Sequence, residues 1–181
     1  AGIGSALAHS VAARGARVLL SARRVDRLNE LARAIPGAEV LALDQHDLDS
    51  LPGKVDEALS RMGGIDVMVH NAGVGQRSLA VDTSFEVDRY LMQTNYLGPV
   101  ALTKLLLPHM REQGRGTIVN VISDAGIWAN PVSGAAYVAS KFGAVGLTAT
   151  INAEERRHGI RACGILRGEI EISVEGMDGR D

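Results

Sequence analysis

The sequence predicts an α/β protein built on a doubly wound parallel sheet, and two observations support that prediction. Short apolar runs rich in Val, Ile and Leu are entered through glycine, which is typical of strands buried on both faces of a parallel sheet. Longer stretches with apolar residues at helical spacing separate these runs, so strand and helix alternate along the chain. Because the 181 residues contain no internal repeat or linker, we expect a single domain over residues 1–181.

The pattern predicts the following elements in chain order. The expected strands are 16–21, 40–43, 65–69, 117–122 and 160–166. The expected helices are 5–14, 25–34, 51–62, 87–113 and 135–158. Pro99 predicts a kink in the fourth of these helices, because proline removes a helical hydrogen bond. Cys163, in the last strand, is expected to be a small core residue.

Composition excludes several classes of protein. Charged residues make up 22% of the chain and the formal net charge is -2, so no basic excess indicates a nucleic-acid partner. No apolar run reaches the roughly 18–20 residues of a membrane span. The single cysteine excludes an internal disulfide and favours a cytoplasmic location. The histidines are scattered without the spacing of metal ligands, so no metal site is expected.

Two features near the N-terminus fit a dinucleotide. Gly2, Ile3 and Gly4 stand directly before the first helix, where glycines let a phosphate approach the backbone N–H groups. Plain turn chemistry is the alternative reading of these residues. Arg23 follows the 16–21 strand, where an acidic residue would hold a ribose 2′-hydroxyl, and an arginine there suits a 2′-phosphate. The alternative is a solvated arginine at the start of a helix.

Polar residues also follow two further strands. Asp44 comes after the 40–43 run, and Asn71, Ala72 and Gly73 come after the 65–69 run. Ligands of doubly wound sheets bind beyond the carboxyl ends of the strands, so these residues are candidates for cofactor binding. A single Asp or Asn at such a place is also a common cap or turn residue.

Tyr137 and Lys141 form the most informative pair. They are four residues apart on a predicted helix and therefore share a face. An ammonium group near a phenol favours the phenolate, so the tyrosine can exchange a proton nearer to neutral pH. Ser123 ends the 117–122 strand, where its hydroxyl can bind a substrate oxygen and the tyrosine oxygen together. Asn95 lies within a predicted helix, although asparagine is a poor helix former, and it needs partners there.

Together these motifs resemble the short-chain dehydrogenase/reductase family, in its Tyr-x-x-x-Lys subclass. The resemblance covers nearly the whole chain in order: Gly2-Ile3-Gly4, Asn71-Ala72-Gly73, Asn95-Tyr96-Leu97-Gly98, the segment 119–126 around Ser123, and Tyr137 with Lys141. It implies a Rossmann-like fold and an NADP(H)-dependent oxidoreductase that interconverts an alcohol and a carbonyl. It also implies a homodimer or homotetramer formed through the long helices.

The resemblance further implies a role for each matched residue. Tyr137 is the expected general acid in reduction and general base in oxidation. Lys141 assists Tyr137 and binds the nicotinamide ribose, Ser123 orients the carbonyl, and Asn95 holds a water that connects Lys141 to solvent. At the cofactor's other end, Asp44 is expected to contact the adenine. Gly2, Ile3 and Gly4 bind the cofactor through the glycine turn, Arg23 selects NADP(H) over NAD(H), and Asn71, Ala72 and Gly73 line the ribose.

The chain departs from the family pattern in several places. The family's first strand, its earlier glycine and its last strand are missing, so we expect a chain truncated at both ends. Arg167-Gly168 replaces a usual Pro-Gly, and Ile172 stands where a Thr is expected. The commonest spacing to the tyrosine selects Asp124 as the counterpart of the family's serine, whereas alignment on the following Ala-Gly pair selects Ser123, which we prefer.

Two other functions fit the motifs less well. A catalytically inactive NADP-binding regulatory or interaction protein would keep the fold without turnover, and the altered Arg167 turn motivates this alternative. A sugar-nucleotide epimerase or dehydratase can share the Tyr-x-x-x-Lys spacing. The Asn71-Ala72-Gly73 turn and the short C-terminal part argue against that class.

Overall fold

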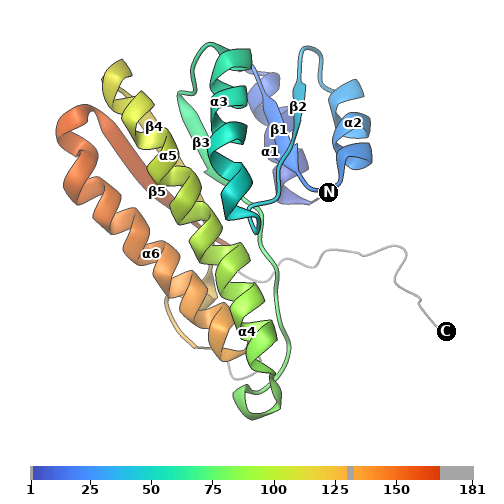
Figure 1. Ribbon diagram of the computed structural model, residues 1–181, viewed down its shortest axis with the longest axis vertical. Coiled ribbons are helices and arrows are strands. Elements are labelled where there is room, and N and C mark those ends of the chain that lie inside the picture. The colour runs from blue at the N-terminus through green and yellow to red at the C-terminus, as the bar shows by residue number, and fades with distance from the viewer. Residues whose placement is uncertain (1, 130–132, 168–181) are drawn as a thin grey trace.

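The computed structural model describes residues 2–129 and 133–167, in which helices and parallel strands alternate (Figure 1). The helices are α1 (Ile3–Ala12), α2 (Val25–Arg33), α3 (Leu51–Met62), α4 (Phe85–Met92), α5 (Gly98–Gln113) and α6 (Ala135–Glu155). The strands are β1 (Leu19–Ala22), β2 (Glu39–Ala42), β3 (Val67–His70), β4 (Gly116–Ser123) and β5 (Ile160–Arg167). The expected order of elements is therefore confirmed, with boundaries that shift by a few residues.

The strands form two parallel sheets in the described residues. In the first, β1 pairs with β2, with Leu20 opposite Val40. In the second, the order is β3-β4-β5, with His70 opposite Asn120. Because all pairings are parallel, the carboxyl ends of neighbouring strands face the same edge of each sheet. Within the described residues no ladder joins β1 to β3, so the two sheets are separate.

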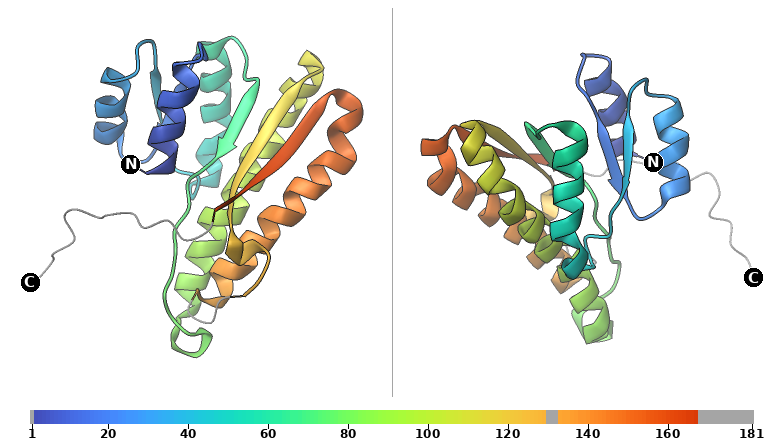
Figure 2. Two further views of the ribbon diagram at one scale, coloured as in Figure 1. Left: turned by 180° about the vertical axis from the view of Figure 1, so that it is seen from behind. Right: turned by 45° about the horizontal axis from the view of Figure 1, so that its top comes forward.

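Helices lie on both sides of the strands, as in a doubly wound fold. In Figure 1, α3, α5 and α6 lie in front of the strands, whereas α1 lies behind them. The view from behind in Figure 2 shows α1 in front of the strands and α5 beyond them. The predicted Rossmann-like arrangement is thus confirmed for the described part of the chain.

Three apolar clusters hold these layers together. The first joins α5 and α6 to the second sheet through Leu106, Met110, Ile118, Ile151, Ile160 and Ala162. The second packs α1 and α2 on the first sheet through Ala8, Leu20, Leu28 and Ile35. The third packs α3 against α5 through Leu51, Val55 and Leu102. Burial of these side chains is the main force that places the strand ends, since each of the Leu, Ile, Val and Met side chains contributes about 1.5–3 kcal/mol.

The expected long helix 87–113 is interrupted. Its first part, α4, ends at Met92, a π-helical turn follows over Gln93–Leu97, and α5 starts at Gly98. The break therefore lies before Pro99, which sits in the first turn of α5, where a proline needs no hydrogen-bond partner. Pro108 lies inside α5, and the helix continues past it to Gln113. A wider π turn re-aims the side chains within it, and one of them is Asn95.

The expectation that Cys163 is a core residue is wrong. Along β5, Ile160 and Ala162 are buried against the helices, while Cys163 is exposed on the other face together with Ile165. Alternation of this kind means that one face of the strand packs on α6 and the other faces outward in the described part of the chain. The apolar run was therefore a poor indicator of burial on both faces.

Among the helices of the described residues, none combines the length and apolar character that crossing a bilayer requires.

Candidate active site

The candidate site lies at the carboxyl ends of β3 and β4. Strand β3 ends at His70 and continues into the exposed segment Asn71, Ala72 and Gly73. Strand β4 ends at Ser123, which also begins the short 3-10 turn Asp124–Gly126. Since the two strands are parallel neighbours, both segments leave the same edge of the sheet.

Helix α6 brings Tyr137 and Lys141 to this edge. The Lys141 ammonium lies 5.7 Å from the centroid of the Tyr137 ring, within the range of a cation–π interaction. The same ammonium donates a hydrogen bond of 3.2 Å to the carbonyl oxygen of Val121 in β4. The predicted sharing of one helix face is confirmed, and the bond to β4 fixes the lysine against the sheet.

Asn95, in the π turn, holds the loop after β3 through its side-chain amide. Its Oδ1 accepts the backbone N–H of Val74 at 2.8 Å, and its Nδ2 donates to the carbonyl oxygen of Val74 at 2.9 Å. The Nδ2 also lies 3.3 Å from the hydroxyl of Ser140. Asn95 is only 6% exposed, so these bonds satisfy the amide that the sequence analysis expected to need partners.

The backbone at Gly73 lies close to both this amide and the lysine. A Cβ atom at Gly73 would lie 3.3 Å from Oδ1 of Asn95 and 3.7 Å from Nζ of Lys141. The loop backbone therefore approaches both side chains closely. Gly73, Asn95, Lys141 and Tyr137 come from three separate segments, and the fold gathers them at one place.

Ser123 lies at the same strand edge but has a local partner. Its hydroxyl donates to the Asp124 carboxylate at 2.7 Å and accepts the N–H of Ala125 at 3.2 Å. The turn packs on α6, because a Cβ atom at Gly126 would lie 2.9 Å from the carbonyl oxygen of Lys141. The turn that follows Ser123 thus lies against α6 at Lys141, while the Ser123 hydroxyl is oriented toward Asp124.

Ser140 was not singled out from the sequence. It lies between Tyr137 and Lys141 on α6, is fully buried, and donates to the carbonyl oxygen of Tyr137 at 2.7 Å. Its hydroxyl also faces the Asn95 amide, so it connects α6 to the π turn. A polar residue one position before the lysine, on a helix with a buried face, was the available signal.

A small cavity lies next to Lys141, which forms part of its wall. Its lining includes His70, Ala72, Asn95, Asn120 and Lys141. Polar atoms thus surround part of this space, which suits an ordered water between Asn95 and Lys141.

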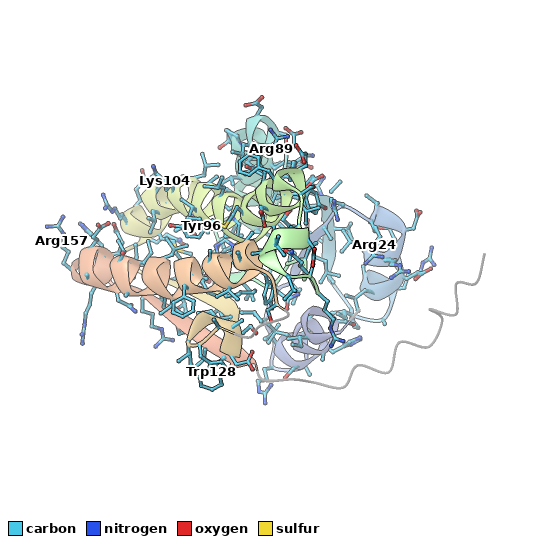
Figure 3. The ribbon with its side chains drawn as sticks, turned by 90° about the horizontal axis from the view of Figure 1, so that it is seen from below. Arg24, Arg89, Tyr96, Lys104, Trp128 and Arg157 are labelled. Atoms are coloured by element: carbon cyan, nitrogen blue, oxygen red, sulfur yellow. The ribbon has the colours of Figure 1, made fainter. Side chains whose placement is uncertain are left out.

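The aromatic Trp128, 59% exposed in the segment after β4, projects at the surface in Figure 3, whereas Tyr96 lies beside α6.

His70 has a structural place at the end of β3. It is the last residue of β3, is 7% exposed, and its Nε2 lies 2.9 Å from the Thr103 hydroxyl in α5. Burial lowers the pKa of His70 to about 4, because the charged imidazolium loses its hydration inside the protein. The imidazole is therefore neutral near neutral pH.

The residues predicted for the cofactor's phosphates lie at the start of α1 and near β3. Gly2 is the N-cap of α1, has a φ of 69°, and no side chain caps the helix. A Cβ atom at Gly4 would lie 2.6 Å from Nδ2 of Asn71, so the glycine brings α1 against the loop after β3. An uncapped helix start with small residues fits a phosphate group, since backbone N–H groups and the helix dipole favour an anion.

Arg23 and Asp44 lie at the ends of β1 and β2. The Arg23 guanidinium donates to the Tyr90 hydroxyl at 3.0 Å. This bond, together with the nearby phenol and the Asp44 carboxylate, raises the pKa of Arg23 above its ordinary value. Asp44 accepts the backbone N–H of His46 at 2.9 Å, which is the turn geometry that the sequence analysis named as its alternative role.

Comparison with known proteins places the chain in a family. The family model for short chain dehydrogenase matches residues 1–177. The chain belongs to the short-chain dehydrogenase family.

Individual relatives agree with this assignment. A dehydrogenase/reductase SDR family protein 7-like of Anopheles gambiae is 38% identical over 182 residues, covering 96% of this chain and 57% of the relative. Among solved structures, a short-chain dehydrogenase from Streptomyces avermitilis is similar with a TM-score of 0.91 and 33% identity, covering 96% of this chain and 65% of that one. A metagenomic short-chain oxidoreductase in complex with NADP has a TM-score of 0.87 and 34% identity, covering 94% and 79%.

The match covers the chain but only part of its relatives. The chain spans little more than half the length of the curated relatives that it matches. The departure at Ile172 lies outside the described residues, and of Arg167, which replaces the usual proline, only the backbone position opposite Ser123 is described.

Proposed function

We propose that this chain forms the cofactor-binding and catalytic part of an NADP(H)-dependent oxidoreductase that interconverts an alcohol and a carbonyl. The observation that supports it most is the gathering of Tyr137, Lys141, Asn95 and Gly73 at the carboxyl ends of β3 and β4. The uncapped start of α1 and the cation of Arg23 fit the anionic parts of a dinucleotide. A bound nicotinamide cofactor would supply or accept the hydride.

The side chains of the site would handle the proton. Tyr137 donates its phenolic proton to the substrate oxygen during reduction and accepts it during oxidation. Lys141 stabilises the phenolate by its positive charge, which lies over the ring. Asn95 fixes the loop that carries Gly73 and, with a water in the neighbouring cavity, connects Lys141 to solvent. Ser123 orients the substrate carbonyl once its hydroxyl turns from Asp124.

Arg23 is the residue that we propose selects NADP(H). Its guanidinium is exposed at the end of β1, and a guanidinium binds a phosphate through two charge-assisted hydrogen bonds. Asp44 and the segment Asn71, Ala72 and Gly73 complete the adenine and ribose parts of the site. Some solved relatives support the choice, since the metagenomic oxidoreductase was solved with NADP. Replacing Arg23 with Asp is expected to shift the preference toward NADH.

Hydride transfer tests the proposal directly. In the full-length protein, we expect NADPH oxidation with a panel of aldehydes and ketones, and a loss of at least about 100-fold in kcat for Tyr137→Phe. Binding of NADPH by Tyr137→Phe should remain near that of the unmodified protein. The matched variant Tyr96→Phe also removes a phenol hydroxyl, at a residue that lines the cavity beside Lys141, and should lose far less kcat than Tyr137→Phe.

Other outcomes would favour the alternative. Binding of NADPH without turnover on any carbonyl or alcohol would support a regulatory or interaction protein. Turnover that survives in Tyr137→Phe would contradict the assignment of the general acid.

The assembly and location of the protein are also proposals. We infer a homodimer or homotetramer formed through α5 and α6, because α6 presents the exposed apolar side chains of Phe142 and Val145. Sedimentation of the full-length protein tests this assembly. A cytoplasmic location is supported by the single cysteine, Cys163, which is a free thiol in the structure.

A further inference from the structure

Arg23 does not stand alone at the end of β1. Its Nη1 donates to the hydroxyl of Tyr90, a residue of α4 that lies 67 positions further along the chain. Tyr90 is 37% exposed, so part of this residue is open to solvent. A phenol that accepts a hydrogen bond from the guanidinium keeps its own O–H available for donation to another acceptor.

A second contact holds the Tyr90 ring in place. The His46 imidazole lies with its centroid 5.0 Å from that of Tyr90, and the two planes are tilted by 33°. The backbone of His46 is itself bound, because its N–H donates to Asp44. Its carbonyl oxygen accepts a hydrogen bond of 3.5 Å from Gln93 in the π turn. The ends of β1 and β2 and the end of α4 thus meet at the Tyr90 ring.

From this arrangement we propose that Tyr90 is a positioning residue for cofactor selection. It holds the Arg23 guanidinium where the 2′-phosphate of the cofactor binds, and it donates its own hydroxyl proton to a phosphate oxygen. This inference rests on the proposed function, since it assumes that Arg23 faces that phosphate.

The chemistry of the two groups explains the advantage. An arginine side chain has many rotamers, and those that are lost on binding weaken affinity. A guanidinium already bound to Tyr90 has lost part of that freedom before the ligand arrives. The phenol adds a neutral donor beside the cation, which partly offsets the nearby Asp44 carboxylate that repels an anion.

The test measures the phosphate contact without turnover. Isothermal titration of the full-length protein with adenosine 2′,5′-bisphosphate and with 5′-AMP separates the 2′-phosphate from the rest of the ligand. We expect Tyr90→Phe, which keeps the ring and its packing on His46, to weaken bisphosphate binding about tenfold. Binding of 5′-AMP should change less than about twofold. Kinetically, the KM for NADPH should rise with little change in kcat, and the KM for NADH should stay constant.

A double-variant cycle checks that Tyr90 acts through Arg23. Arg23→Ala should remove most of the preference for the bisphosphate, and Tyr90→Phe added to it should weaken binding by clearly less than tenfold. Tyr96→Phe serves as the matched control and should leave both titrations unchanged.

The possible failures are distinguishable. If the unmodified protein binds the bisphosphate no more tightly than 5′-AMP, the proposed choice of NADP(H) fails and the inference fails with it. If the preference exists and depends on Arg23 but survives in Tyr90→Phe, only the inference about Tyr90 is overturned. Equal weakening of both ligands in Tyr90→Phe would overturn it as well, because Tyr90 would then serve the fold.

Discussion

At the end of β3, the imidazole of His70 is 7% exposed and bonded to Thr103. Its pKa is lowered to about 4 by burial, whereas an unfolded chain binds a proton near pH 6.5. Between these two values the unfolded state holds more protons than the folded state. The stability contributed by neutral His70 is therefore complete above pH 6.5 and is lost as the pH falls toward 4.

We expect the free energy of unfolding to fall by about 2 kcal/mol from this residue between pH 7 and pH 5. Urea denaturation at both pH values measures it, because the unfolding free energy varies linearly with urea. In His70→Asn, which cannot titrate in this range, that part of the pH dependence should disappear. His9→Asn, at an exposed histidine, should keep it. An equal pH dependence in His70→Asn and the unmodified protein would contradict the expectation.

Contacts between residues of one helix could be predicted from the sequence, whereas contacts between distant segments could not. The Tyr137–Lys141 pair could be predicted because four positions along a helix place two side chains together wherever the helix lies. The partners of Asn95 and Arg23 could not be predicted in this way. Val74 and Tyr90 are distant along the chain, and only the packing of separate segments brings them near.

At the scale of elements, α5 and α6 are joined by a carboxylate and a guanidinium. Both nitrogens Nε and Nη2 of Arg111 donate to the carboxylate of Glu155, with 2.7 Å for the bond from Nε. Glu155 is 1% exposed, while the side chain of Arg111 is 46% exposed. The hydrogen bonds from Arg111 hold the pKa of Glu155 below its ordinary value. The pair therefore stabilises the fold above the unfolded pKa of the carboxyl and loses effect as the pH falls through the folded one.

Because Glu155 is buried and Arg111 is partly exposed, we expect variants of the two residues to destabilise the protein by different amounts. Glu155→Gln keeps the shape and one acceptor and leaves Arg111 free to reach water, so it should cost about 1 kcal/mol. Arg111→Met leaves a buried carboxylate without its partner and should destabilise more. Adding Glu155→Gln to Arg111→Met should recover part of the loss. Guanidinium denaturation of the three variants gives the order, and a larger loss in Glu155→Gln than in Arg111→Met would refute it.

Element boundaries were predictable where apolar spacing was regular and unpredictable where the hydrogen-bond pattern changed. The ends of α2 and α3 lie close to the expected ones, because their apolar residues repeat at helical spacing. The π turn Gln93–Leu97 was missed, since a single wider turn leaves no distinct spacing in the sequence.

The start of α5 offers a second prediction at this scale. A Cβ atom at Gly98 would lie 2.5 Å from the carbonyl oxygen of Gln45, a backbone atom in the segment after β2. Because a backbone atom cannot move away cheaply, Gly98→Ala should destabilise the protein by about 2 kcal/mol. The matched variant Gly53→Ala, in α3 with nothing within 4 Å of its Cβ, should be neutral or stabilising. Thermal unfolding of both variants checks the contrast, and equal melting temperatures would contradict it.

At the scale of the whole molecule, side chains rather than strand ladders connect the two sheets in the described residues. Arg17, just before β1, donates to the carbonyl oxygen of Met62 at the end of α3 at 2.9 Å. Gly4 lets the start of α1 approach Asn71 after β3. The alternation of strands and helices was predictable from the sequence, but these connections were not. Each depends on how two separately packed units meet, namely the first sheet with its helices and the second sheet with its helices.

A ligand that contacts both units should therefore stabilise the molecule as a whole. If NADPH binds as proposed, a concentration of 100 times its Kd should raise the unfolding free energy by about 2.7 kcal/mol. Gly4→Ala tests the junction, since its Cβ would lie 2.6 Å from Nδ2 of Asn71 and displace that amide. The amide is the movable end of a side chain, so without ligand the variant should lose less than about 1 kcal/mol.

With about tenfold weaker binding, the same NADPH concentration should stabilise Gly4→Ala by only about 1.4 kcal/mol. Urea denaturation with and without NADPH measures both values, and Gly53→Ala should gain as much as the unmodified protein. An undiminished gain in Gly4→Ala would show that the junction of α1 with the loop after β3 does not hold the cofactor. A large loss of stability without ligand would show instead that this close approach serves to hold the two units together.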